Sequence, residues 1–243
     1  MSEMTPFSPL ELMDLQANAL FTHDANGRMV TKAQPWDGTA AAPKFYLGRT
    51  TNGKVMTRFR HDVSASIIDK LEALLKNETP ALAFDEMPVC KNQYLEILGE
   101  TNCWGGPCWL VPAHAAQEKQ DASEPAPVFI TRHNINTFSV KGFEWLLDEI
   151  DVAEPCAGVI IEGRLVSLCR SVRRTPAAHE AGLETTPEFR GKGYAGMCVK
   201  SWAAAVKNLG ALPFYSTSWN NGNSQKVAEK LGFYYVGNNF SIG

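Results

Sequence analysis

The strongest constraint in this sequence is a glycine-rich junction in its last third. The segment reads Thr185-Thr186-Pro187-Glu188-Phe189-Arg190-Gly191-Lys192-Gly193-Tyr194-Ala195-Gly196. It predicts a strand that ends in a proline turn, followed by a glycine loop and the first turn of a helix. The glycines let the backbone approach a bound group closely, and a helix N-terminus offers unpaired N–H groups and the positive end of the helix dipole. The junction therefore predicts a site for a phosphate or a similar anion.

Two common phosphate-binding motifs fit this junction poorly. The three glycines of the loop match GxGxxG, but a dinucleotide site needs an acidic residue about 20 positions further on. No Asp or Glu lies between Glu188 and Glu229. A P-loop needs Ser or Thr after its Gly-Lys pair, whereas Lys192 is followed by Gly193. The acid-free stretch also holds Arg190 and several lysines, so its local field favours a ligand with several phosphates.

Two motifs together carry a resemblance to a known family. Arg190-x-x-Gly193-x-Ala195 resembles the pyrophosphate loop of the GCN5-related N-acetyltransferase (GNAT) superfamily, whose pattern is Gln/Arg-x-x-Gly-x-Gly/Ala. Downstream, the segment from Asn221 to Phe233 resembles the Asn-x-x-Ala/Ser…Gly-Phe motif of the same superfamily. The resemblance covers residues 126–243. It implies an enzyme that transfers an acetyl group from acetyl-CoA, its cosubstrate, directly to an amine acceptor.

The resemblance also implies which residues bind the cosubstrate. In the resembled family, the strand before the loop pairs with the pantetheine arm, the loop amides bind the pyrophosphate, and the asparagine motif packs beside the arm. Carried over position by position, the expected cofactor-binding residues are Leu183, Glu184, Thr185, Arg190, Gly191, Lys192, Gly193, Tyr194, Ala195, Gly196, Asn221 and Ser224.

The catalytic groups of the resembled family are missing from their usual positions. Ala228 occupies the position of the tyrosine that acts as general acid in the family. Ser216 occupies the position of a glutamate that some members use as base. Glu180 and Glu184 share one face of the expected strand, and His179 lies on the other. We expect Glu184, the carboxylate closest to the expected thioester, to be the catalytic base. The alternative for Glu184 is an ion-paired or solvent-facing strand residue, and Glu180 and His179 rank lower as bases.

The pattern of apolar residues and turns predicts an α+β fold in two parts. The first domain, 1–125, should contain a helix that begins at Ser8, hairpins at Asp24–Gly27 and Asn52-Gly53, and an amphipathic helix through Ile67–Leu75. A polar, proline-ended run at 113–127 is expected to link the domains.

The second domain, 126–243, should alternate strands and helices. Its expected strands are 128–131, 157–161, 165–168, 180–185, 214–217 and one that begins at Phe233. Its expected helices lie around 143–147, after Gly193 and at 224–231. The resemblance implies that these strands form a mixed, mostly antiparallel twisted sheet of GNAT type flanked by helices.

Composition narrows the class of protein. The 243 residues are 44% hydrophobic with a net charge of −3, which indicates a globular protein and gives no support to a nucleic-acid partner. No run approaches the ~20 apolar residues of a membrane span, so we expect no membrane partner and a cytoplasmic location. The six cysteines are scattered singly and are expected to be reduced. Cys103 and Cys108 lack the companions of a zinc site, so no metal is expected.

Two other functions remain open at this stage. A binding module that keeps the cofactor fold without the activity, as a CoA-responsive sensor or scaffold, agrees with the missing tyrosine. A purely structural interaction protein would bind no CoA and would tolerate Gly193→Glu. The acceptor, a small-molecule or peptide amine, is not set by the sequence. The first domain either shapes the acceptor site or holds a homodimer, and the hydroxyls and indole of 216–221 either line an acceptor pocket or form an ordinary strand and turn.

Overall fold

A computed structural model describes residues 6–112 and 125–243. In chain order its main elements are α1 (Pro9–Leu20), β1 (Phe21–His23), β2 (Met29–Lys32), β3 (Phe45–Thr50), β4 (Val55–Phe59), α2 (Ala65–Leu75), α3 (Lys91–Leu98), β5 (Cys103–Leu110), β6 (Val128–Phe129), α4 (Leu146–Glu149), β7 (Cys156–Ile161), β8 (Arg164–Arg174), β9 (Ala178–Thr185), α5 (Tyr194–Asn208), β10 (Leu212–Ser216), α6 (Gly222–Lys230) and β11 (Tyr234–Ile242). The predicted linker 113–127 falls mostly outside the described residues, so the domain boundary near residue 125 stays a prediction.

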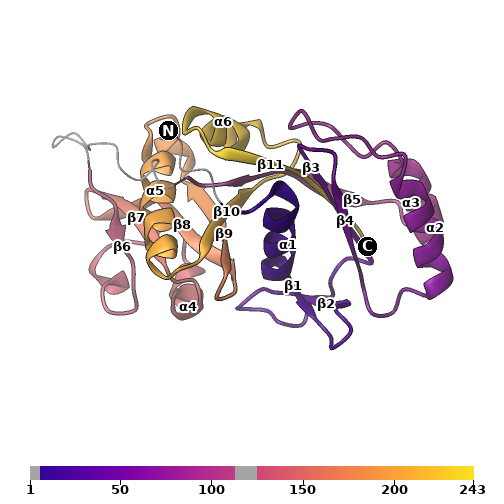
Figure 1. The fold of residues 1–243 in the computed structure, drawn as a ribbon. Coiled ribbons are helices and arrows are strands. Elements are labelled where there is room, and N and C mark those ends of the chain that lie inside the picture. The colour runs from indigo at the N-terminus through magenta and orange to yellow at the C-terminus, as the bar shows by residue number, and fades with distance from the viewer. Residues whose placement is uncertain (1–5, 113–124) are drawn as a thin grey trace.

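Within the described residues, nine strands form one sheet in the order β4-β3-β11-β5-β10-β9-β8-β7-β6 (Figure 1). Every neighbouring pair is antiparallel except β9 and β10, which run parallel. Strands β1 and β2 form a separate hairpin. The expectation of a mixed, mostly antiparallel sheet flanked by helices is therefore confirmed.

Strand β5 comes from the first half of the chain but lies between β10 and β11 of the second half. It pairs antiparallel with both neighbours. The residue pattern did not predict this strand, because Gly105-Gly106-Pro107 is a run that strands normally avoid. Through β5, and through β3 paired to β11, the two halves share one continuous sheet.

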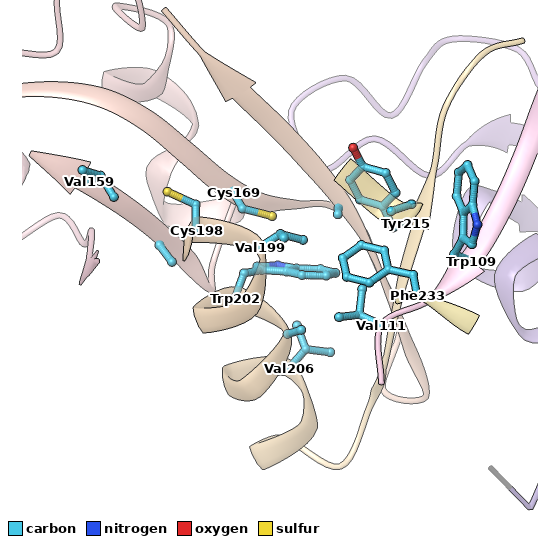
Figure 2. Packing of buried hydrophobic residues seen from close by; sticks show 14 of the residues in the cluster. Trp109, Val111, Val159, Cys169, Cys198, Val199, Trp202, Val206, Tyr215 and Phe233 are labelled. Carbon is cyan, nitrogen blue, oxygen red and sulfur yellow. The ribbon is translucent and has the colours of Figure 1, made fainter. Parts of the chain in front are cut away.

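Helices α1 and α5 cover opposite faces of the sheet. On β9, Ala181 packs in the core cluster that contains the inner face of α5, whereas the neighbouring Glu180 is bound by Gln16 of α1. Because successive strand residues point to opposite faces, α1 lies on the Glu180 face. Figure 2 shows the α5 side, where the fully buried Trp202 sits among aromatic and aliphatic side chains from the sheet.

Most of the predicted local elements are confirmed. Ser8 and Glu11 form the expected capping box of α1, and both predicted hairpins are present as β1–β2 and β3–β4. Two elements are shorter than expected. The helix predicted around 143–147 is the single turn α4 followed by a 3-10 turn at Ile150–Val152, and the strand predicted at 128–131 covers only Val128–Phe129.

The described residues contain no helix with both the length and the apolar character needed to cross a bilayer. All six cysteines lie in the described part of the chain and are free thiols, as expected.

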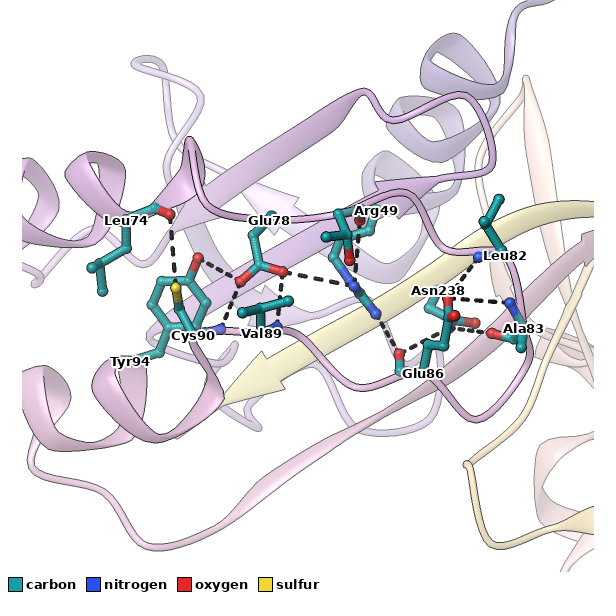
Figure 3. Close-up of polar contacts among 11 residues, drawn as sticks. Arg49, Leu74, Glu78, Leu82, Ala83, Glu86, Val89, Cys90, Tyr94 and Asn238 are labelled. Atoms are coloured by element: carbon teal, nitrogen blue, oxygen red, sulfur yellow. Dashed lines mark hydrogen bonds and ion pairs between the residues drawn. The ribbon is translucent and has the colours of Figure 1, made fainter.

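The buried carboxylate of Glu78 links β3 to helix α3 and to the residues just before α3. Glu78 accepts hydrogen bonds from the backbone N–H groups of Val89 and Cys90, each at 3.1 Å, and from the hydroxyl of Tyr94 at 3.0 Å. Its Oε2 lies 3.7 Å from Nη1 of Arg49, and the two side chains are 0% and 1% exposed. Figure 3 shows this network between α2, α3 and the sheet.

Glu78→Gln is expected to lower the free energy of unfolding by about 3 kcal/mol, because it leaves the buried Arg49 charge without its counter-ion. Urea denaturation measures the loss. The matched control is Glu72→Gln on the exposed side of α2, for which a change within about 0.5 kcal/mol is expected. Equal losses in the two variants would contradict this role of Glu78.

Candidate active site

Strands β9 and β10 run side by side only over their first residues. Residues 212–214 of β10 pair with 178–180 of β9, after which β10 continues along β5, with Ser216 opposite Cys108. Among the described residues, the edge of β9 from 181 to 185 therefore has no strand on the β10 side, while its other edge pairs with β8. Backbone N–H and C=O groups on such an edge can pair with an extended ligand as an added strand would.

Glycines in β5 explain why β10 leaves β9. Beyond β10, the N–H of Thr217 donates to the carbonyl of Pro107 at 3.2 Å, and that of Trp219 donates to Gly105 at 3.1 Å. A Cβ on Gly106 would lie 2.1 Å from the carbonyl oxygen of Thr217. Only a glycine permits this close approach, so the segment after β10 follows β5 and a gap opens beside β9. The segment between Cys103 and Cys108 thus determines the path of the residues after β10 through its backbone.

Two of the predicted side chains on the open part of β9, those of Leu183 and Thr185, are turned into the protein. Leu183 packs against the core beneath α5, and the hydroxyl of Thr185 lies 2.8 Å from that of Ser167. These residues consequently offer their backbone, and not their side chains, to the gap. This arrangement agrees with the backbone role that the sequence assigned to Leu183 and Thr185.

The glycine loop lies between β9 and α5, as predicted. Gly191 and Gly193 have φ angles of +77° and +85°, which glycine adopts without strain. A Cβ built on either one would meet no atom of the described residues within 4 Å, so these residues leave the space in front of the loop open. Helix α5 begins at Tyr194 with no side-chain cap, and the N–H groups of its first turn, including those of Ala195 and Gly196, have no partner within the helix. The loop can therefore bind an anion.

Two cations border the loop. Nε of Arg190 donates to the carbonyl of Thr185 at 3.3 Å, and Nζ of Lys192 lies 4.6 Å from the ring centre of Phe189. Both cationic side chains are exposed. They add positive charge at the end of the gap where the α5 dipole is also positive.

The second predicted motif lies at the start of α6. Oδ1 of Asn221 accepts the N–H of Ser224 at 3.2 Å and thereby caps the helix. The first turn of α5 lies against the far end of α6, because a Cβ on Gly196 would lie 3.6 Å from the side chain of Leu231, which follows α6. Contact of Asn221 and Ser224 with a cofactor stays a prediction. Ala228, at the position of the family tyrosine, is 0% exposed.

Glu180 lies at the point where β9 and β10 separate. Its Oε1 accepts a hydrogen bond from Ser216 Oγ at 2.6 Å and its Oε2 accepts one from Gln16 Nε2 at 3.0 Å. Burial raises the pKa of the Glu180 carboxyl, while the bonds from Ser216 and Gln16 and the charge of Arg173 lower it, and the net shift is upward. The side chain is 4% exposed. Glu180 thus brings a carboxylate next to Ser216, and no local pattern in the sequence indicated its partner Gln16 from α1.

Glu184, the base expected from the sequence, lies further along the same face of β9. It is exposed, opposite Leu168 of β8. Partial burial of its carboxyl raises the pKa of Glu184, Arg170 lowers it and Glu149 raises it further. Two carboxylates therefore lie on one face of β9. Glu180 is enclosed where β9 and β10 separate, and Glu184 lies near the surface.

The first half of the chain also reaches this face. The Arg170 guanidinium lies between two indole rings, 4.5 Å from that of Trp36 and 3.9 Å from that of Trp145, and it forms an ion pair with Glu149. Trp36 belongs to the first half, as does Gln16. Residues from both halves therefore surround the open part of β9.

His179 lies at the opposite end of β9 from the loop. Its Nδ1 is 2.8 Å from Ser171 Oγ, which also accepts the indole N–H of Trp202 at 3.0 Å. Burial lowers the pKa of His179, with a further lowering from Arg174. The ring borders a mainly apolar cavity of about 730 Å³ beneath the end of α5. Neither His179 nor this cavity adjoins the gap between β9 and β10.

Comparison with known proteins finds a similarity in the second half of the chain. The sequence model of the GNAT acetyltransferases matches residues 156–239, which include β7 to β10, the glycine loop and most of β11. Residues 156–239 are therefore similar to a GNAT acetyltransferase domain. No curated protein matches the chain in sequence.

Solved structures of GNAT proteins are similar to this chain at low sequence identity. A GCN5-related N-acetyltransferase from Kribbella flavida is 10% identical with a TM-score of 0.50, over 97% of this chain and 95% of that one. A GNAT-family acetyltransferase from Novosphingobium aromaticivorans is 20% identical with a TM-score of 0.41, over 57% and 63% of the two chains. A GCN5-related N-acetyltransferase-like protein from Streptococcus suis is 19% identical with a TM-score of 0.46, over 62% and 66%. The chain thus spans less than two thirds of the last two proteins.

Proposed function

We propose that this GNAT domain transfers an acetyl group directly from acetyl-CoA to an amine, which makes the protein an N-acetyltransferase. The observation that carries the proposal is the gap between β9 and β10, with a free strand edge along one side and the glycine loop of α5 at its mouth. An extended arm with an anionic end matches both features. The acceptor is a small-molecule or peptide amine.

The residues present fit acetyl-CoA. The open space in front of Gly191 and Gly193 leaves room for a diphosphate, and the unpaired N–H groups at the start of α5 would bind it, helped by Arg190 and Lys192. The backbone of residues 181–185 would align the pantetheine arm. Acetyl-CoA supplies a thioester whose thiol leaves readily, so the protein must mainly align the reactants and provide an unprotonated amine.

We assign the general base to Glu180. It lies where the open strand edge begins, and its raised pKa makes it a stronger base than an exposed glutamate. Ser216 donates to its Oε1 and can pass a proton between the amine and this oxygen. Glu184, the base expected from the sequence, is the alternative on the same face of β9.

Ala228, at the position of the family tyrosine, cannot protonate the leaving thiolate. Another residue must therefore donate this proton. The hydroxyl of Tyr215 reaches the first turn of α6, where it donates to the carbonyl of Ser224 at 3.4 Å. Burial raises the pKa of Tyr215 to about 12, so the phenol keeps its proton at neutral pH. We assign the role of general acid to Tyr215.

The test is acetyl-CoA binding by calorimetry together with release of free thiol against a panel of amines. Saturable binding with amine-dependent thiol release is expected. Tight binding with no acetylation of any amine would favour the alternative, a CoA-responsive sensor or scaffold. Absence of binding to CoA and its acyl forms would overturn both functions.

A further inference from the structure

A second cavity, of about 510 Å³, lies on the α1 face of the sheet. The end of α1, the β2 strand and the sheet strands β3, β5, β8 and β11 contribute to its lining. Its lining includes the polar or aromatic side chains of Gln34, Tyr46, Trp104, Arg173 and Ser241.

Glu180 does not line this cavity, but residues that do line it lie close to Glu180. Arg173 stands opposite Glu180 in the register of β8 and β9, and the charge of Glu180 acts on the pKa of both Arg173 and Tyr46. Gln16, which binds Glu180, lies one helical turn before Leu20, another lining residue. The cavity therefore extends toward the carboxylate that we assign as the base.

Arg173 brings a positive charge to this cavity, with few bonded partners among the described residues. Its one hydrogen bond recorded in the described part of the chain goes from Nη1 to the carbonyl of Val172 at 3.0 Å, and no ion pair is formed by Arg173 there. Burial lowers the pKa of Arg173, although Glu180 raises it. Both oxygens of Glu180 already accept other hydrogen bonds. The guanidinium donors are therefore available to an anionic ligand.

A buried amide points to a polar ligand on the same face. Asn239 is 0% exposed, and neither its Nδ2 nor its Oδ1 has a hydrogen-bond partner among the described residues. It pairs across the strands with Gly48, whose Cβ would contact Met13 of α1, and Ser241, a lining residue, follows two positions later. Cross-strand partners and alternate residues share a face, so Asn239 also lies on the α1 face. An unpaired buried amide is costly unless water or a ligand binds it.

We propose that this cavity is the acceptor pocket and that the acceptor is an α- or β-amino acid, whose carboxylate is bound by Arg173 while its amine faces Glu180. Cross-strand neighbours such as Arg173 and Glu180 are separated by about 5 Å at the backbone. Such a spacing suits a ligand whose amine and carboxylate are one or two carbons apart. The inference rests on the proposed acetyl transfer and adds the class of acceptor.

The test uses the full chain with acetyl-CoA and a panel of α- and β-amino acids, each compared with its own carboxamide. We expect kcat/KM to be about 10- to 100-fold higher for the acids, the difference expected when a charge-assisted bond to arginine is lost. Arg173→Gln should remove this preference by lowering kcat/KM for the acids alone, and Arg173→Lys should restore part of it. Arg174→Gln is the matched control, because the next residue of β8 is exposed and borders the other cavity.

Several outcomes would overturn the inference. Carboxamides that react as well as acids in the unmodified protein would do so, and this comparison does not depend on any variant. Equal losses for acids and amides in Arg173→Gln would do so as well, provided that its melting temperature and its affinity for acetyl-CoA are unchanged. If no amine is acetylated, calorimetry measures how tightly the CoA complex binds the same panel. Acids that bind no more tightly than their amides would overturn the inference.

The failure of the proposed function looks different. A protein that binds no acetyl-CoA contradicts the acetyltransferase itself. One that binds acetyl-CoA and acetylates amines without preference for a carboxylate contradicts only the assignment of the acceptor.

Discussion

Glu180→Gln is expected to lower kcat by about 10²- to 10⁴-fold, the range for loss of a positioned general base. The substitution removes the basic oxygen but keeps the shape of the side chain. Its amide can accept the bond from Gln16 and donate to Ser216, so the packing beneath α1 should persist. The KM for acetyl-CoA should change little, because Glu180 is not among the proposed cosubstrate contacts. Steady-state kinetics of thiol release measure both parameters.

The pH profile gives a second measure of the same role. A base must be ionised to act, and burial raises the pKa of Glu180. The acid limb of kcat/KM should therefore lie above the value of about 4.3 that is ordinary for glutamate. This limb should be absent from the residual activity of Glu180→Gln.

Stability should change in the opposite direction to activity. Because its pKa is raised, Glu180 binds a proton more tightly in the folded state than in the unfolded chain. Its ionisation therefore weakens folding as the pH rises above about 4.3. Glu180→Gln should thus have an equal or higher Tm at pH 7, and this difference should vanish in acid.

Glu184→Gln is the comparison that decides between the two carboxylates. With Glu180 as the base, it should affect kcat much less and leave the acid limb in place. A large loss of kcat in Glu184→Gln alone, with normal activity in Glu180→Gln, would instead support the base expected from the sequence.

Gly193→Glu is expected to raise the Kd for CoA by about 10²- to 10³-fold, which corresponds to the loss of one or two charge-assisted hydrogen bonds. Gly193 precedes α5 with a φ of +85°. A side chain there is strained, occupies the open space in front of the loop and places a negative charge where the diphosphate should bind. Calorimetry with CoA measures the change.

Gly210→Glu separates this effect from backbone strain. Gly210 follows α5 at its other end, has a φ of +81° and also has no atom within 4 Å of a built Cβ. The two variants should therefore lose similar stability, measured by thermal unfolding, while only Gly193→Glu loses affinity for CoA. Unchanged affinity in Gly193→Glu would contradict the site and would favour a protein with no CoA function.

The sequence was sufficient for features that depend on neighbouring residues. Gly191, Gly193 and the turn at Pro187 predicted the loop and the start of α5, because positive φ angles and helix termini are local properties. Ser8 and Glu11 predicted the beginning of α1 for the same reason. The site residues on the loop remain predictions about a ligand, but their place in the fold follows from the chain itself.

Strand β5 and the setting of Glu180 depended on contacts between distant segments. Gly105-Gly106-Pro107 has poor strand propensity, yet it forms a central strand because β10 and β11 satisfy its backbone from either side. Glu180 looked like any strand carboxylate until folding placed Gln16, 164 positions away, against it. The sequence alone therefore predicted local conformation. Burial and pairing across the sheet, which set the proton affinity of a carboxylate, were decided only by tertiary structure.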